Sequence, residues 1–284
     1  MRGNQFSVSA LCACFMIVTA GLAFASDESL SLSSRMRDED AVLKTLNPQE
    51  RQSRLDSRLL RAARHGRVEW ANYCLQKGAN VNTADGEQMT PLMYAALLGQ
   101  REIVSLLISA GADLDAADVQ GVSALMHASW SGHVEIANDL IEAGALVNLK
   151  EITYSRRFKK RASDALMAAS AGGSAETVQL LLANGANVDQ QDDDGESALF
   201  HAVRKNDRRV ISMLLNGGAW IESRDKYRLT PLMAAAIYAD PETVRLLLRY
   251  GANRNAVDMN KLTAAEYAKQ LGRNDIYLVL SDSP

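Results

Sequence analysis

The chain has 284 residues, a formal net charge of −3, 47% hydrophobic residues and 23% charged residues. This is the composition of a folded soluble protein, and it excludes wholesale disorder and a polytopic membrane protein. The slightly acidic balance also argues against nucleic acid as a partner, because proteins that bind nucleic acid carry a surplus of Lys and Arg.

The first 25 residues have the pattern of a secretory signal peptide. Arg2 precedes an apolar stretch over residues 10–24, and a small-residue motif ending at Ala25 comes before acidic residues. The stretch is shorter than the ~20 apolar residues that cross a bilayer, so cleavage after Ala25 is favoured over a retained anchor. The mature protein is therefore expected in the periplasm or outside the cell.

The three cysteines are Cys12, Cys14 and Cys74. Cleavage of the leader leaves Cys74 alone, so the mature protein has no intramolecular disulfide. The helical register places Cys74 at a buried leucine position, which favours an inert thiol. An exposed Cys74 would instead favour a disulfide-linked dimer, and the oligomeric state stays open.

A Gly-Ala dipeptide recurs along the chain with steps of 33, 33, 41, 33 and 33 residues, beginning at Gly78, Gly111, Gly144, Gly185, Gly218 and Gly251. A second motif keeps the same phase, as in Thr90-Pro91-Leu92-Met93 and Thr230-Pro231-Leu232-Met233. Self-similarity at a fixed period indicates stacked units of one kind.

Local chemistry divides each unit into two helices. Thr90 can cap a helix, and Pro91 fits its first turn, where the missing N–H would be unpaired anyway. A leucine-rich segment such as residues 103–107 forms a second helix, which Gly111 ends because glycine readily takes the left-handed conformation.

These motifs resemble the ankyrin repeat, whose 33-residue unit carries a Thr-Pro-Leu-His-x-Ala signature, over residues 55 to 280. The resemblance implies an all-α solenoid of stacked helix-turn-helix units with β-hairpin fingers. Residues 55–284 are expected to form this domain in about seven units. Residues 26–54 are interpreted as a polar N-terminal segment that can be flexible, with a short helix over 40–46.

The resemblance implies that the chain binds another protein with its hairpin tips and the exposed ends of its inner helices. The expected tip residues are Glu87, Met89, Gln120, Val122, Glu196, Tyr227 and Leu229. The expected helix-end residues are Arg64, His65, Leu97, Leu98, Trp130, Arg204, Lys205, Ile237 and Tyr238. Large apolar and aromatic groups at such positions are typical binding anchors. For Trp130 the alternative is peripheral packing against the next repeat.

The 41-residue step contains eight extra residues, which fall in the basic segment 150–161. Insertions in solenoids form loops, often on the binding face. Arg156, Arg157, Phe158 and Lys160 are therefore candidate contacts for an acidic partner or for an anionic membrane surface. A solvated long hairpin remains the alternative.

No group of residues in the sequence has the spacing of a known metal-binding, cofactor-binding or catalytic motif. A row of methionines can indicate copper, but packed helices lie ~8–10 Å apart, so Met93, Met126, Met167 and Met233 are expected to fill the core. Residues 189–196 do not match the register of a calcium loop, and His127 and His201 lack zinc spacing. No cofactor and no catalytic residue is expected.

We therefore expect a non-catalytic interaction module in the periplasm, which binds or protects an envelope protein. One alternative is a secreted effector that binds a host protein. Another is a hydrolase whose catalytic groups come from different repeats.

Overall fold

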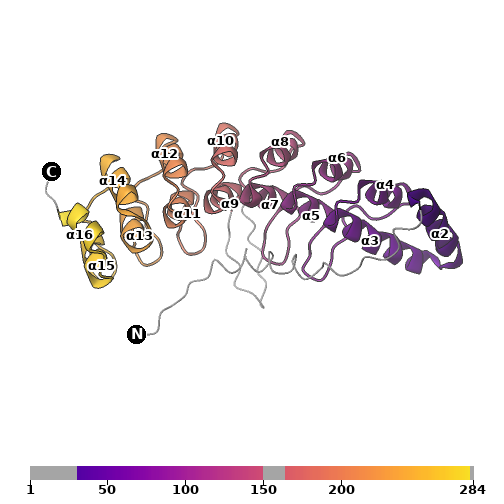
Figure 1. The fold of residues 1–284 in the computed structure, drawn as a ribbon, viewed down its shortest axis with the longest axis horizontal. Helices are drawn as coiled ribbons and strands as arrows, with labels where there is room; N and C mark the ends of the chain where they lie inside the picture. The colour runs from indigo at the N-terminus through magenta and orange to yellow at the C-terminus, as the bar shows by residue number, and fades with distance from the viewer. Residues whose placement is uncertain (1–30, 150–163, 282–284) are drawn as a thin grey trace. The chain divides into compact units, whose positions relative to one another are not determined.

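The computed structural model describes residues 31–149 and 164–281, so the predicted signal peptide and the basic insertion lie outside the described residues. Within these two ranges the chain is helical apart from turns, hairpins and two isolated antiparallel bridges (Figure 1). No described helix is long and apolar enough to cross a membrane. The helices are α2 (Leu32–Thr45), α3 (Pro48–Arg64), α4 (Val68–Gln76), α5 (Pro91–Leu97), α6 (Arg101–Ser109), α7 (Ala124–Ser131), α8 (Val134–Glu142), α9 (Ala165–Gly172), α10 (Ala175–Ala183), α11 (Ala198–Lys205), α12 (Arg208–Asn216), α13 (Pro231–Tyr238), α14 (Pro241–Arg249), α15 (Ala264–Gln270) and α16 (Asn274–Ser281).

The chain divides into two compact units, with the boundary between Arg54 and Leu55. In the first unit, α2 begins at Leu32 rather than at Asp40, because the hydroxyl of Ser31 caps it. Glu39 on α2 is only 3% exposed, and its carboxylate accepts two hydrogen bonds from Arg54, at 2.6 and 3.0 Å. A bidentate pair of this kind compensates the cost of burying the carboxylate.

The second unit is a solenoid of helix-turn-helix pairs arranged in two rows (Figure 1). In the first row each of α5, α7, α9, α11, α13 and α15 packs against the next, and the most extensive of these contacts joins α7 to α9. In the second row α4, α6, α8, α10 and α12 pack in succession, and α14 packs on α16. The expected all-helical solenoid is thereby confirmed.

A stripe of equivalent residues forms the core between the rows. Leu107, Leu140, Leu181, Leu214 and Leu247 lie one repeat apart and are all 0% exposed. Cys74 occupies the same position in the first repeat and is also fully buried. The prediction of a buried Cys74 is therefore confirmed. Stability in such an array comes mainly from contacts between neighbouring repeats.

Methionine takes part in the start of two first-row helices. The hydroxyl of Thr90 accepts the N–H of Met93 at 3.3 Å, and the thioether sulfur of Met93 accepts the N–H of Thr90 at 3.4 Å. Thr230 and Met233 repeat this arrangement. Methionine thus replaces the family's signature histidine and still completes a reciprocal cap.

The hairpins between repeats begin at a common aspartate, found at Asp85, Asp118, Asp192, Asp225 and Asp258. In each case the Oδ1 atom accepts the backbone N–H groups two and four residues later, at 2.7 to 3.0 Å. These two bonds close the turn and fix the hairpin relative to the helix that follows.

A ladder of hydrogen bonds also joins neighbouring repeats, in the turns that follow the second-row helices. A side-chain oxygen in one repeat accepts a backbone N–H just after the Gly-Ala dipeptide of the next, at 2.7 to 2.9 Å. The pairs are Asn82 with Asp113, Asp115 with Leu146, Asn148 with Asn187, Asp189 with Trp220, and Glu222 with Asn253. The ladder therefore continues across the insertion.

Candidate functional site

The exposed ends of the first-row helices form a surface that we call the inner-helix face. Of the predicted contact residues, Leu97, Trp130, Arg204 and Ile237 are half-buried there, and Tyr238 is 50% exposed. Tyr227, at a hairpin tip, is 51% exposed. Arg156, Arg157, Phe158 and Lys160 lie outside the described residues.

Trp130 sits at a close approach of two first-row helices, α7 and α9. A Cβ atom placed on Gly172 of α9 would collide with the carbonyl oxygen of Trp130 on α7. The neighbouring positions on α9 are small as well, including Ser170 and Ala171. The backbones of α7 and α9 are therefore in contact at Trp130, whose side chain is half-buried.

A charged side chain is held in place beside Tyr238. Arg204 on α11 donates to both carboxylate oxygens of Glu196, one of these bonds measuring 2.8 Å. Its guanidinium carbon lies 5.4 Å from the centroid of the Tyr238 ring on α13. Burial lowers the pKa of Arg204, but the bonds to Glu196 more than offset this, and the net pKa is raised. The face thus presents a permanently charged Arg oriented against an aromatic ring.

Two of the expected tip residues are not at the surface. Met89 is 4% exposed and Glu196 is 5% exposed, so their assignment to the hairpin tips was wrong. Both stand four residues after the hairpin aspartate, where the backbone N–H bonds back to that aspartate. The carboxylate of Glu196 is bound by Arg204, whereas Glu87 and Tyr227, two residues after the hairpin aspartate, are exposed.

The hairpin aspartates also contact the next helix. The Oδ2 atom of Asp85 accepts the hydroxyl of Tyr94 at 2.6 Å, and Asp258 accepts that of Tyr267 at the same distance. Asp118 lies 3.2 Å from Nε2 of His127, and both side chains are almost fully buried. A Tyr or His stands nine residues after four of the five hairpin aspartates, so this contact has a signal in the sequence.

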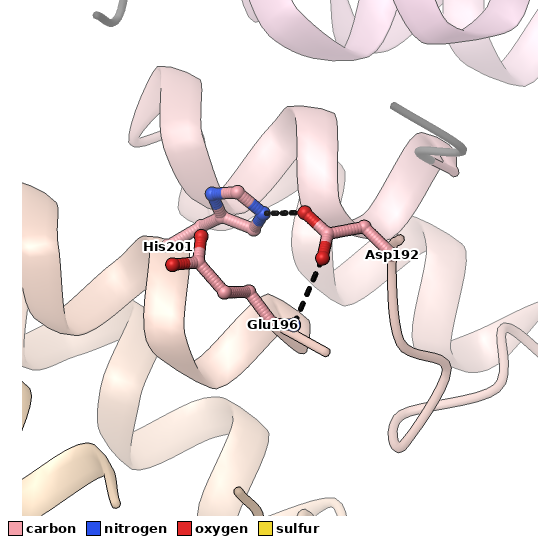
Figure 2. Close-up of side chains that lie close together, drawn as sticks. All are labelled: Asp192, Glu196 and His201. Carbon is pink, nitrogen blue, oxygen red and sulfur yellow. Dashed lines mark hydrogen bonds and ion pairs between the residues drawn. The ribbon is translucent and has the colours of Figure 1, made fainter. Parts of the chain in front are cut away.

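Asp192 and His201 form the same pair in the fifth repeat, and Glu196 joins them (Figure 2). Potential ligand atoms of Asp192, Glu196 and His201 all lie within 4.8 Å of one another, and no other such group of three occurs in the described ranges. Oδ2 of Asp192 is 3.7 Å from Nε2 of His201. A cluster of these residue types could in principle ligate a divalent cation.

The hydrogen bonds of the cluster favour a structural role instead. Arg204 occupies both oxygens of Glu196, and two backbone N–H groups occupy Oδ1 of Asp192. A cation would have to displace the guanidinium that already neutralises Glu196. Burial raises the pKa of Asp192, but His201 and the N–H of Glu196 lower it by a larger amount. The net pKa is below the ordinary value.

Comparisons with known proteins agree with this geometry. The sequence profile described as Ankyrin repeats (3 copies) matches residues 58–151, 154–225 and 210–283. No curated protein sequence matches the chain. The crystal structure of the human ASB11 ankyrin repeat domain is similar, with a TM-score of 0.71 and 27% identity over 80% of this chain and 98% of that one. The repeat motifs, the stacked helix pairs and the profile together place this chain in the ankyrin repeat family.

Proposed function

We propose that this chain is a non-catalytic protein-binding module whose inner-helix face contacts the partner. Ankyrin repeats are generally protein–protein interaction modules. The observation that carries the proposal for this chain is the arrangement of Glu196, Arg204 and Tyr238. A buried carboxylate holds an Arg against a ring that is 50% exposed.

Arg and Tyr are the residue types that dominate binding free energy at protein interfaces. Long side chains normally lose conformational freedom when they bind. Arg204 has already lost much of this freedom, because Glu196 and Tyr238 fix its guanidinium. The ordering cost on binding is correspondingly smaller.

We propose the periplasm as the compartment and an envelope protein as the partner. The support is the signal-peptide pattern of residues 1–25, followed by a chain of soluble composition. Cell fractionation with N-terminal sequencing tests this. A mature chain that begins at Ser26 in the periplasmic fraction supports the proposal. The same chain found only in the culture medium would favour a secreted protein that acts on a host target.

Binding is tested by chemical cross-linking of a tagged chain in its native cells, followed by purification. The test variant is Trp130→Ala/Tyr238→Ala. The matched control is Tyr250→Ala, which removes an aromatic ring that is 38% exposed at the end of α14, in the second row. Circular dichroism and urea midpoints establish that both variants remain folded.

The proposal predicts one cross-linked protein with the wild type and the control, and its loss with the double variant. Equal cross-linking of that protein by all three chains would reject the inner-helix face. The insertion would then be tested with Arg156→Ala/Arg157→Ala/Phe158→Ala/Lys160→Ala, together with vesicles of anionic phospholipid as the probe for a membrane surface.

A further inference from the structure

One hairpin position carries residues that fit its backbone poorly. The position three residues after the hairpin Asp has a positive φ in every described hairpin. It is glycine at Gly121 and Gly195, which adopt φ 80° and 78° without strain. Gln88, Arg228 and Lys261 hold the same conformation, with φ 59°, 64° and 62°. A long side chain at such a position is disfavoured by the backbone.

Two of these residues are cations on neighbouring hairpins. Arg228 lies between α12 and α13, and Lys261 lies between α14 and α15. Both are exposed, and neither forms an ion pair with any residue in 31–149 or 164–281. Their charges are therefore available to a ligand.

Apolar side chains stand beside the two cations. Tyr227 precedes Arg228 and is 51% exposed, and Met259 on the next hairpin is 62% exposed. We call Tyr227, Arg228, Met259 and Lys261 the C-terminal hairpin edge. Exposed apolar groups set among unpaired charges are typical of a surface that is covered by a partner.

The hairpins that carry this edge are fixed to each other. The backbone N–H of Met259 donates to the carbonyl of Tyr227 at 3.2 Å. Arg224 donates to the carbonyl of Arg228 at 3.3 Å and to that of Val257 at 2.9 Å, so one side chain joins both hairpins. The equivalent residues of the second and third repeats are Ala84 and Ala117, whose methyl groups cannot make such a bond.

Charge is distributed unevenly along the described chain. Residues 101–149 and 164–196 contain fourteen Asp and Glu and one Arg. Residues 204–281 contain thirteen Lys and Arg and eight Asp and Glu. Residues 204–281 therefore carry a net positive formal charge, which favours an acidic ligand over a basic one at the C-terminal hairpin edge.

We propose that the C-terminal hairpin edge binds an acidic peptide segment of a partner protein. The proposal rests on the protein-binding function proposed above and specifies the chemistry of the partner. Neighbouring repeats are spaced by ~10 Å. A peptide in the polyproline II conformation covers ~9 Å in three residues and brings every third side chain back to the same side. Carboxylates three residues apart can therefore meet Arg228 and Lys261 together, with an apolar side chain between them against Tyr227 and Met259.

The probe is a fluorescein-labelled peptide of repeated Glu-Ser-Leu triplets, titrated with the purified protein and followed by fluorescence anisotropy. The matched peptide replaces every Glu by Gln. The test variant is Arg228→Gly/Lys261→Gly, which removes both charges and relieves the backbone strain, so it remains folded. The control variant is Gln88→Gly, which makes the same backbone change at the N-terminal end of the array.

The expected result is salt-sensitive binding of the acidic peptide only. The test variant should weaken it at least tenfold without lowering the urea midpoint, and the control variant should leave it unchanged. Equal binding of the Gln peptide, or unchanged affinity of the test variant, would overturn the proposal. So would binding of anionic phospholipid vesicles without binding of the peptide. If the Trp130→Ala/Tyr238→Ala variant loses its cross-linked partner while the peptide fails to bind, the protein-binding function stands and only this inference falls.

Discussion

The side-chain Oδ1 of Asn148 accepts a hydrogen bond from the backbone N–H of Asn187 at 2.8 Å, across the insertion. Nδ2 of Asn148 also donates to the carbonyl of Gly185 at 2.9 Å. One repeat earlier, where there is no insertion, the side-chain Oδ1 of Asp115 accepts the backbone N–H of Leu146 in the same way. The insertion thus lengthens a connection while the two repeats keep the same contact. Loop closure entropy grows only slowly with length, so such an insertion is tolerated.

The substitution Asn148→Ala should destabilise the protein by about 1 kcal/mol or slightly more, because it removes both bonds across the insertion. Urea denaturation of the purified protein measures the change. Asn138→Ala is the control, since Asn138 bonds only to Glu142 on its own helix. If the two variants unfold at the same urea concentration, the ladder contributes nothing to the stacking of these repeats.

The substitution Gly172→Ala should destabilise the protein by about 1–3 kcal/mol, because the added methyl group forces α9 away from α7 at Trp130. Thermal unfolding measures the loss, and Trp fluorescence reports the changed surroundings of Trp130. Gly86→Ala is the control, since a Cβ there meets nothing within 4 Å. Equal melting temperatures for the two variants would contradict the close approach of the helices.

Two hairpin aspartates should respond to pH in opposite senses. The net pKa of Asp192 is lowered, since His201 and the N–H of Glu196 outweigh burial, whereas burial raises the pKa of Asp225. Because its pKa is lowered, ionised Asp192 stabilises the folded state at any pH above ~3.9, the pKa of Asp in an unfolded chain. This stabilisation is lost as the pH falls through the lower pKa of the folded state. Ionised Asp225 instead costs stability at neutral pH, and protonation removes that cost.

The substitutions Asp192→Asn and Asp225→Asn isolate the charge, because an amide oxygen can still accept the backbone N–H groups. At pH 7 Asp192→Asn should lower the urea midpoint, and the difference from wild type should vanish in acid. Asp225→Asn should keep or raise the midpoint at pH 7. Parallel pH profiles for the two variants would show that these environments do not differ as described.

Cys74 should react with a thiol reagent such as DTNB only after unfolding, because its side chain is 0% exposed. The mature protein should release one equivalent of product in denaturant and almost none when folded. Three equivalents would show that Cys12 and Cys14 remain, and hence that the leader is not cleaved. Rapid reaction of the folded protein would contradict the burial of Cys74.

The array could be predicted from the sequence because each repeat contains the residues that start, end and bury its own helices. Thr90 and Pro91 start a helix, Gly111 ends one, and Leu107 marks the core, so one unit defines the others. The contact surface was predictable only in part. Tyr227 and Tyr238 are exposed as expected, but Glu196 is buried against Arg204, a contact that position in the repeat does not reveal.

The sequence by itself determined the period, the places where the helices of each repeat start and stop, and the identity of the core stripe, because these depend on capping, backbone conformation and burial within one repeat. The bounds of α2, outside the repeats, were not predicted. The tertiary structure decided which side chains of different repeats meet. Gly172 touches Trp130, Asn148 binds Asn187, and Arg204 lies over Tyr238 only because the repeats stack in one register. Contacts of this kind join residues about one repeat apart, and their distances follow from packing rather than from local sequence.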